Sequence, residues 1–344
     1  MRRRLRILII AVPLLVVGGD FLLWRFAVAR LQAGLDAWTA GQRSAGWMVG
    51  LTGSQTGGWP FAATLTLRDV TIQGGDPAVP GGVAWTSDHL VLRIAMLRPT
   101  RLEIAAAGAG HLRVADSPDV AYTAAHLSVA LPLQAGGPPR ALDVRANDLR
   151  AGLPAGPVGI DSLAAHAALT PTAGQGEAAV TLAIDATGVS LPPAMKWALG
   201  PRIAAMSISA ALDGPLPRDG GLTARATSWR DDGGSLEIRR LETTWGPLGL
   251  TATATLALDL QLQPMGAGAA KVKGYAETAD AMASHGLMSR SAATAAKALL
   301  SLLAGVPDDG QPSEVEVPLS LQYRTLSMRQ VPLVRLPELD WPPQ

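Results

Sequence analysis

Histidine, cysteine and carboxylate side chains carry out most acid–base and metal chemistry in proteins, so we place them first. The sequence contains no cysteine, which excludes disulfides, thiolate metal sites and cysteine nucleophiles. No two histidines have the spacing that places a metal-binding pair on one face of a helix. The histidines are more typical of surface or core residues than of ligands: His89, His111, His126, His166 and His285.

The glycine-rich stretches also lack the context that catalysis requires. Gly266-Ala267-Gly268 is followed by Lys271 where a dinucleotide-binding fingerprint needs glycine, and no strand–helix–strand unit is predicted around it. Carboxylates beside glycine at 231–234 and 308–310 indicate turns, and a Gly-x-Ser-x-Gly elbow is absent from the sequence. We therefore predict a protein that is not an enzyme and has no cofactor or metal. An extracytoplasmic hydrolase, with a site assembled from distant strands, is the least favoured alternative.

Composition and charge exclude one class of partner. The chain of 344 residues is 48% hydrophobic but only 4% aromatic, and its net charge is +1. Four arginines lie within the first six residues, which leaves 25 cationic and 28 acidic residues in the remainder. A slightly acidic body lacks the electrostatic footprint of a nucleic-acid-binding protein. We expect no nucleic-acid partner.

The N-terminal segment combines this arginine cluster with an apolar run over residues 7–24. As a helix the run is about 27 Å long, which is just enough to cross the hydrocarbon layer of a membrane. We predict that residues 1–25 form a single anchor, with the arginines in the cytoplasm and the body on the other side. The alternative is a cleaved signal peptide that ends at the small residues 27–29. Both alternatives export the body.

Apolar residues then recur at every second position through most of the chain. In the stretch GGWPFAATLTLRDVTI (57–72), Phe61, Leu65 and Leu67 lie on one face, and the phase changes at Arg68-Asp69. A similar change occurs at residues 185–188. Alternation with short connections indicates antiparallel sheet with one buried face, and a change of phase indicates a bulge or bend, which curves a sheet. We predict a mainly β fold, a long curved antiparallel sheet that forms a groove or half-barrel.

Few helices are expected beside this sheet. Residues 26–56 are predicted to form a juxtamembrane helix and a linker, and residues 57–330 a β-rich extracytoplasmic domain with a helical insertion near 277–304. A further helix is predicted over 192–205. The helix near 277–304 is interpreted as a lid packed across the apolar sheet face, with a membrane-surface role as its alternative. The candidate lid residues are Leu299, Leu300 and Leu303, and residues 331–344 form an extended, Pro-rich tail.

Several short motifs occur in a fixed order along the chain. The arginine-led segment is followed by Gly57-Gly58-Trp59-Pro60-Phe61, Trp85, LRPTRLEI (97–104), TTWGPLGLTATATLALD (243–259) and VPLVRLPELDWP (331–342). In this order the sequence resembles the bacterial domain-of-unknown-function family 2125 over most of its length. The segment 243–259 is also similar to parts of AsmA-like envelope proteins. These resemblances imply a periplasmic protein, anchored in the bacterial inner membrane, with a long apolar-lined β-groove, and they imply no catalytic residues.

Two functions are consistent with these features. The first is a non-enzymatic, membrane-anchored protein whose apolar groove binds or handles lipid in envelope biogenesis. The second is an envelope scaffold with a closed core, which binds other envelope proteins through its edges or loops. The candidate groove residues share one strand face: Phe61, Leu65, Leu67, Leu127, Val129, Leu131, Leu256, Leu258 and Leu260.

Overall fold

A computed structural model describes residues 2–75, 82–115, 117–133, 139–217, 219–303, 314–328 and 331–341, with only the backbone described at 2–13, 302, 303 and 331. This part of the chain contains fifteen strands and four helices, so the prediction of a mainly β, antiparallel fold is confirmed. The contacts divide the chain into two compact units, unit 1 (Met1–Pro139) and unit 2 (Arg140–Gln344). The sequence had predicted one β-rich domain over residues 57–330.

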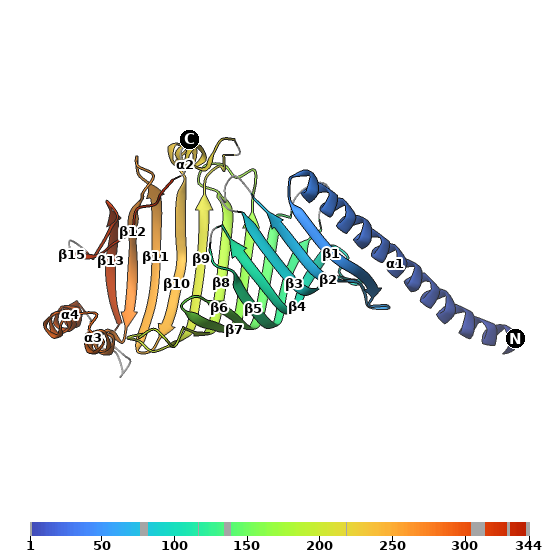
Figure 1. Ribbon diagram of the computed structural model, residues 1–344, viewed down its shortest axis with the longest axis horizontal. Helices are drawn as coiled ribbons and strands as arrows, with labels where there is room; N and C mark the ends of the chain where they lie inside the picture. The colour runs from blue at the N-terminus through green and yellow to red at the C-terminus, as the bar shows by residue number, and fades with distance from the viewer. Residues whose placement is uncertain are drawn as a thin grey trace. The chain divides into compact units, whose positions relative to one another are not determined.

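Unit 1 consists of one long helix and a five-stranded antiparallel sheet (Figure 1). The strands follow one another in sequence order, and the helix contacts the first two of them. The helix continues without a break through the predicted anchor and the predicted juxtamembrane helix. The elements are α1 (Arg2–Ser44), β1 (Met48–Gly57), β2 (Ala62–Gly74), β3 (Val83–Ala95), β4 (Arg101–Val114) and β5 (Val120–Pro132).

The core of unit 1 lies between α1 and the sheet. The alternation in β2 puts Leu65 and Leu67 on the same face, where they are 0% and 1% exposed. Leu31 of α1 belongs to the same buried cluster, together with Leu90 and Leu92 of β3. The apolar residues that alternate along the strands therefore pack in one core against the apolar residues of α1.

A break in β2 keeps the apolar residues on this face. Asp69 has a positive φ of 48°, and the register between β1 and β2 shifts on both sides of the Thr52–Arg68 pair. Beyond Asp69, Val70 is buried and Ile72 packs against the cluster. The irregularity predicted at Arg68-Asp69 is thus confirmed, and it restores the burial pattern that the change of phase would have inverted.

Residues with a positive φ also interrupt other strands. In β4 of unit 1, Gly108 has a φ of 90°, and a Cβ there would lie 2.9 Å from the carboxylate of Asp88 on β3. In unit 2, Asp148 and Gly188 have φ values of 49° and 62°. The second break predicted from the sequence, at residues 185–188, is therefore present at Gly188.

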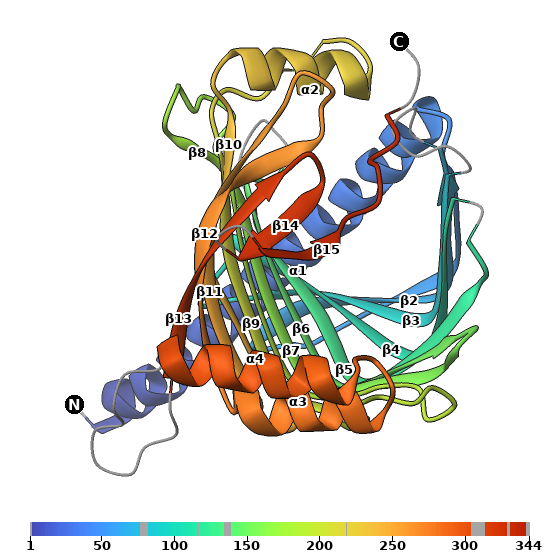
Figure 2. The ribbon, with the colours of Figure 1, turned by 90° about the vertical axis from the view of Figure 1, so that its left-hand side faces the viewer.

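Unit 2 contains ten antiparallel strands, also in sequence order, and three short helices. Figure 2 shows α3 and α4 side by side at one end of the strands and α2 at the other end. The elements are β6 (Ala141–Leu153), β7 (Gly156–Leu169), β8 (Ala178–Ser190), β9 (Arg202–Asp213), α2 (Leu222–Asp231), β10 (Ser235–Trp245), β11 (Leu248–Leu258), β12 (Pro264–Lys273), α3 (Tyr275–Ser284), α4 (Arg290–Leu303), β13 (Glu314–Gln322), β14 (Thr325–Met328) and β15 (Val331–Arg335).

Several predicted elements differ from the observed ones. The helix near 277–304 is two helices, α3 and α4, separated at Gly286, whose φ is 74°. The segment predicted as a helix over 192–205 is a connection of turns followed by the start of β9, because it joins two paired strands, β8 and β9. The expected linker that ends at residue 56 contains β1, and α2 was not predicted.

The tail after β15 is held by several contacts, among them two hydrogen bonds of one buried side chain. The amide of Gln263, on the β11–β12 connection, donates to the backbone oxygen of Leu339 at 3.0 Å and accepts from its N–H at 2.9 Å. The indole of Trp341 donates to the backbone oxygen of Leu262 at 3.0 Å. The predicted extended tail therefore includes a strand and a docked end.

Among the residues that the structure describes, no helix contains an apolar stretch long enough to cross a membrane. The anchor predicted over residues 1–25 falls partly on residue 1, which lies outside the described residues, and on 2–13, whose side chains are not described.

The core of unit 1 predicts a large difference between two leucine-to-alanine substitutions. Leu65 is 0% exposed, whereas Leu97, on the β3–β4 turn, is 97% exposed. We expect Leu65→Ala to lower the free energy of unfolding by about 2–5 kcal/mol and Leu97→Ala to change it by less than about 0.5 kcal/mol. Urea titration measures both values, and equal effects of the two substitutions would contradict this packing.

Candidate functional site

One side of α1 faces the sheet of unit 1 between residues 23 and 38. The residues on this side recur three or four positions apart, which is the spacing of one face of an α-helix. Leu31 is buried in the core cluster, and Leu35 packs against it. The facing residues of the helix are Leu23, Phe26, Ala27, Arg30, Leu31, Gly34, Leu35 and Trp38.

The strands opposite α1 carry three apolar rows that cross the sheet from β2 to β5. Each row arises because residues paired across antiparallel strands point to the same side of the sheet. The observed register gives these rows directly. They are Leu67–Leu90–Ala106–Leu127, Leu65–Leu92–Ile104–Val129 and Ala63–Ile94–Leu102–Leu131.

Burial along these rows falls with distance from α1. The β2 and β3 members are all buried, with exposed fractions of 9% or less. The β4 and β5 members, such as Ile104 and Val129, are only half-buried. The helix therefore seals the β2–β3 part of the apolar face and leaves the β4–β5 part facing open space.

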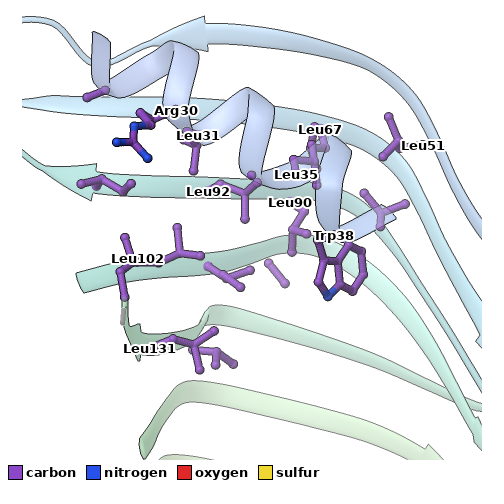
Figure 3. A pocket seen from close by; sticks show the side chains of 18 of the residues that line it. Arg30, Leu31, Leu35, Trp38, Leu51, Leu67, Leu90, Leu92, Leu102 and Leu131 are labelled. Atoms are coloured by element: carbon purple, nitrogen blue, oxygen red, sulfur yellow. The ribbon is translucent and has the colours of Figure 1, made fainter. Parts of the chain in front are cut away.

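A cavity of about 1220 Å³ occupies this space. Figure 3 shows side chains of α1, among them Leu31, Leu35 and Trp38, facing Leu90, Leu92 and Leu102 of the strands. The cavity exceeds the range of about 300–1,000 Å³ that is usual for small-molecule sites. All its lining residues belong to unit 1.

The two ends of the cavity differ. At one end Trp38, Leu51 and Trp85 line it, and the indole of Trp85 donates to the hydroxyl of Tyr122 at 2.8 Å. Burial raises the pKa of the Tyr122 hydroxyl, against the opposing effect of this hydrogen bond. At the other end the lining residues include Met96, Pro99 and Leu133, which belong to the β3–β4 turn and the end of β5.

Arg30 is the one charged residue among those that line the cavity. Its guanidinium lies 5.4 Å from the centre of the Phe26 ring, a cation–π contact. In the part of the chain that the structure describes, no carboxylate forms an ion pair with it. An otherwise apolar cavity thus has a single cation on its wall (Figure 3).

The predicted groove residues fall into three groups. Leu67, Leu127, Val129 and Leu131 line the cavity, whereas Leu65 is sealed in the core beneath α1. Phe61 lies in the β1–β2 turn and is 80% exposed. These residues all belong to unit 1.

The predicted groove residues of unit 2 lie elsewhere. Leu256 and Leu258 are half-buried on β11. Leu260 is 81% exposed in a turn rather than on a strand, because the carboxylate of Asp259 accepts the N–H groups of Gln261 at 2.9 Å and Gln263 at 2.8 Å and ends β11 there. In the sequence, apolar residues occupy every second position from Ala252 to Leu262, and this alternation concealed the turn.

The predicted lid residues belong to α4. This helix contacts α3 and β13. Leu299 is 43% exposed and Leu300 is half-buried, while the side chain of Leu303 lies outside the described ones. The alternation of the sequence did not reveal that α1 would form the wall opposite the sheet, although Leu31, Leu35 and Trp38 recur at helical spacing in the sequence.

Several polar and titratable side chains form separate pairs on the strands. His111 and Asp119 are 2.7 Å apart, and His166 and Asp143 are also 2.7 Å apart. Ser207 donates to Asp185 at 2.5 Å. Within the described ranges no group of three or more His, Asp or Glu residues is placed to hold a metal ion. These pairs lie on the polar parts of the strands and do not border the cavity.

Comparison with known proteins identifies one related family. Residues 24–337 match the family described as "Uncharacterized protein conserved in bacteria (DUF2125)". No curated protein and no solved structure matches the chain. The match covers nearly the whole chain, including all the strands that line the cavity and, of α1, every lining residue except Leu23.

The burial of Tyr122 predicts a measurable titration. Because burial disfavours the phenolate, we expect Tyr122 to ionise at a pH above the ordinary tyrosine value of about 10. Subtracting the ultraviolet pH titration of Tyr122→Phe from that of the natural protein isolates this ionisation. The ionisation of Tyr122 should not change the free energy of unfolding below about pH 10. Above that pH, the free energy of unfolding should fall as the pH rises through the raised pKa. A midpoint at or below 10 would contradict the burial of this hydroxyl.

Proposed function

The chain belongs to the DUF2125 family of uncharacterised bacterial proteins, and we propose that it is a non-enzymatic envelope protein that holds lipid acyl chains in the cavity of unit 1. The observation that carries the proposal is the cavity itself. Its volume is about 1220 Å³, and Arg30 is the one charged residue in its lining. We further propose that the protein is anchored in the inner membrane by its N-terminal segment, with both units in the periplasm.

The chemistry of the lining favours acyl chains over other ligands. Leucine, isoleucine, valine and alanine predominate in the three apolar rows, and only Phe26, Trp38 and Trp85 are aromatic. An aliphatic wall offers no hydrogen bonds to a polar ligand, whereas each methylene that leaves water contributes about 0.8 kcal/mol. A long aliphatic chain is therefore the ligand that gains most from this surface.

The half-buried rows on β4 and β5 argue against the alternative of a scaffold with a closed core. In a closed core, side chains fill the space at the density of an organic crystal. Here the buried rows under α1 meet that condition, but Ile104, Val129 and their neighbours border open space. An apolar surface of this extent needs a covering partner, and an acyl chain is one that fits inside the cavity.

The N-terminal part of α1 supports the proposed anchor. Its leucine and valine side chains are well exposed, for example Leu14 at 66%, Leu15 at 76% and Leu22 at 69%. Such side chains are stable in hydrocarbon and unfavourable in water. With the arginine cluster at residues 2–6, the segment has the charge asymmetry that keeps its N-terminus in the cytoplasm.

A glycine on the cavity wall provides a direct test of lipid binding. Gly34 of α1 lines the cavity, and a Cβ there would meet no atom within 4 Å. We expect Gly34→Trp to fill part of the space and to reduce the lipid that co-purifies with the protein in mild detergent by about fivefold or more. Native mass spectrometry followed by lipid extraction measures the amount.

Gly41 supplies the matched control. It lies seven residues further along α1, on nearly the same side of the helix, and a Cβ there also meets no atom within 4 Å. Gly41 does not line the cavity, so Gly41→Trp should retain lipid at the natural level. Natural protein that carries no lipid, or equal retention by the two variants, would overturn the proposal.

The single cation predicts a preference among lipids. Because Arg30 has no carboxylate partner among the described residues, we expect an anionic headgroup to be favoured over a zwitterionic one at this point. Arg30→Gln should lower the anionic fraction of the retained lipid by about threefold while leaving the total close to natural. Arg25→Gln, which changes a cation outside the lining, should leave the fraction unchanged. An unchanged fraction in Arg30→Gln would show that Arg30 does not contact the headgroup.

A further inference from the structure

One end of unit 1 carries large apolar side chains on three chain connections. Trp59 and Phe61 lie in the β1–β2 turn, Leu97 in the β3–β4 turn and Leu133 directly after β5. Their exposed fractions are 46%, 80%, 97% and 43%. We call these four residues the rim. Antiparallel order places these connections at the same end of the strands, so the four side chains belong to one surface.

The helix α1 leaves the sheet at the rim. The indole of Trp24 donates to the backbone oxygen of Gly57 at 3.1 Å, and the ring of Phe21 contacts that of Trp59 at 6.3 Å between centroids. N-terminal to these contacts, α1 extends past the ends of β1 and β2 (Figure 1). Leu14 is seven residues before Phe21, about 10 Å further along the helix axis.

The phenylalanines of the chain are found at this end. The chain has only three phenylalanines, and they are Phe21, Phe26 and Phe61, with exposed fractions of 45%, 62% and 80%. Exposed aromatic rings close to an apolar helix are typical of the boundary between hydrocarbon and water. An isolated surface leucine needs no explanation, but a rim shared by three connections does.

The chain connections at the rim carry cations and no described carboxylate. The β3–β4 turn carries Arg98, and β4 begins with Arg101, whereas the described parts of the rim connections contain no carboxylate. At the opposite end, the β4–β5 connection contains Asp119, which pairs with His111, and β4 carries Arg113. Cations beside an apolar rim suit a surface of anionic headgroups.

The cavity reaches the rim. Met96, Pro99 and Leu133 line its near end, and the last two residues lie beside or within the rim. From these observations we propose that the rim lies in the headgroup layer of the bilayer that holds the N-terminal part of α1. The cavity then opens on the bilayer, and an acyl chain enters it without crossing water.

This inference relies on the proposed function only for the embedding of α1, because contact between the rim and the bilayer does not require lipid in the cavity. The absence of native cysteine makes single labelling positions available. The full chain carrying Leu97→Cys, labelled with bimane, is reconstituted in phosphatidylcholine–phosphatidylglycerol vesicles whose acyl chains are brominated near the headgroup. We expect at least a twofold loss of fluorescence relative to vesicles without bromine. Phe61→Cys, on the neighbouring turn, repeats the measurement.

Val114→Cys is the control, because Val114 is at the opposite end of β4 and is 43% exposed. Its label should not be quenched. The proposal is overturned if the labels at 61 and 97 remain unquenched, or if they are quenched no more than the label at 114. The rim would then be a surface that binds a protein partner.

Two further comparisons separate this inference from lipid binding. Quenching at 97 should persist in the Gly34→Trp background, because brominated chains of the bilayer rather than a lipid in the cavity cause it. If quenching disappears in that background, the rim does not contact the bilayer. Lipid extraction from the same purified protein reports on the cavity independently: retained lipid with an unquenched label contradicts only the rim, and quenching without retained lipid contradicts only the proposed function.

Discussion

The apolar face of the sheet in unit 1 is wider than the helix that lies on it. An α-helix with its side chains is about 10–12 Å in diameter, whereas five strands about 4.8 Å apart span about 19 Å. Since α1 contacts β1 and β2, it seals the rows at Leu65 and Leu67 and cannot reach their ends at Val129 and Leu131. The cavity is the direct result of this difference in width, and the apolar rows that border it are the surface that a ligand must cover.

Backbone breaks keep that surface apolar over the full length of the strands. A strand of thirteen residues such as β2 would normally present strictly alternating faces. The positive φ at Asp69 returns Val70 and Ile72 to the side of Leu67, and the glycine at 108 meets the same geometric need in β4 beside Asp88. The bends lengthen the apolar face at the cost of local strain, which glycine and aspartate tolerate better than most residues.

Unit 1 has one cation in the lining of its cavity, and its rim end exposes large apolar side chains. Arg30 lies on the cavity wall, where it stacks on Phe26 and has no anionic partner among the described residues. The rim end carries exposed aromatic and leucine side chains beside Arg98, and the other end carries both Asp119 and Arg113. An amphiphile with an acyl chain and an anionic headgroup matches this arrangement better than a uniformly apolar or uniformly polar molecule.

The sequence alone determined the antiparallel β-class, most strands of unit 1, the helical stripe of α1 and the breaks at Asp69 and Gly188. These features depend on local periodicity and on φ preferences, which the order of side chains records. Periodicity failed where a single side chain changed the local hydrogen bonding, as at Asp259, whose turn removed Leu260 from the strand, and where glycine at 286 divided the predicted lid helix.

Only the tertiary structure decided what covers the apolar face. Alternation assigns Leu65, Leu127 and Leu256 equally to a buried side, but it cannot say that the first is sealed under α1 and the second lines a cavity. That difference depends on contacts between residues more than thirty positions apart, such as Trp24 with Gly57, and on how wide a helix is relative to a sheet. Neither quantity is encoded in the spacing of neighbouring residues.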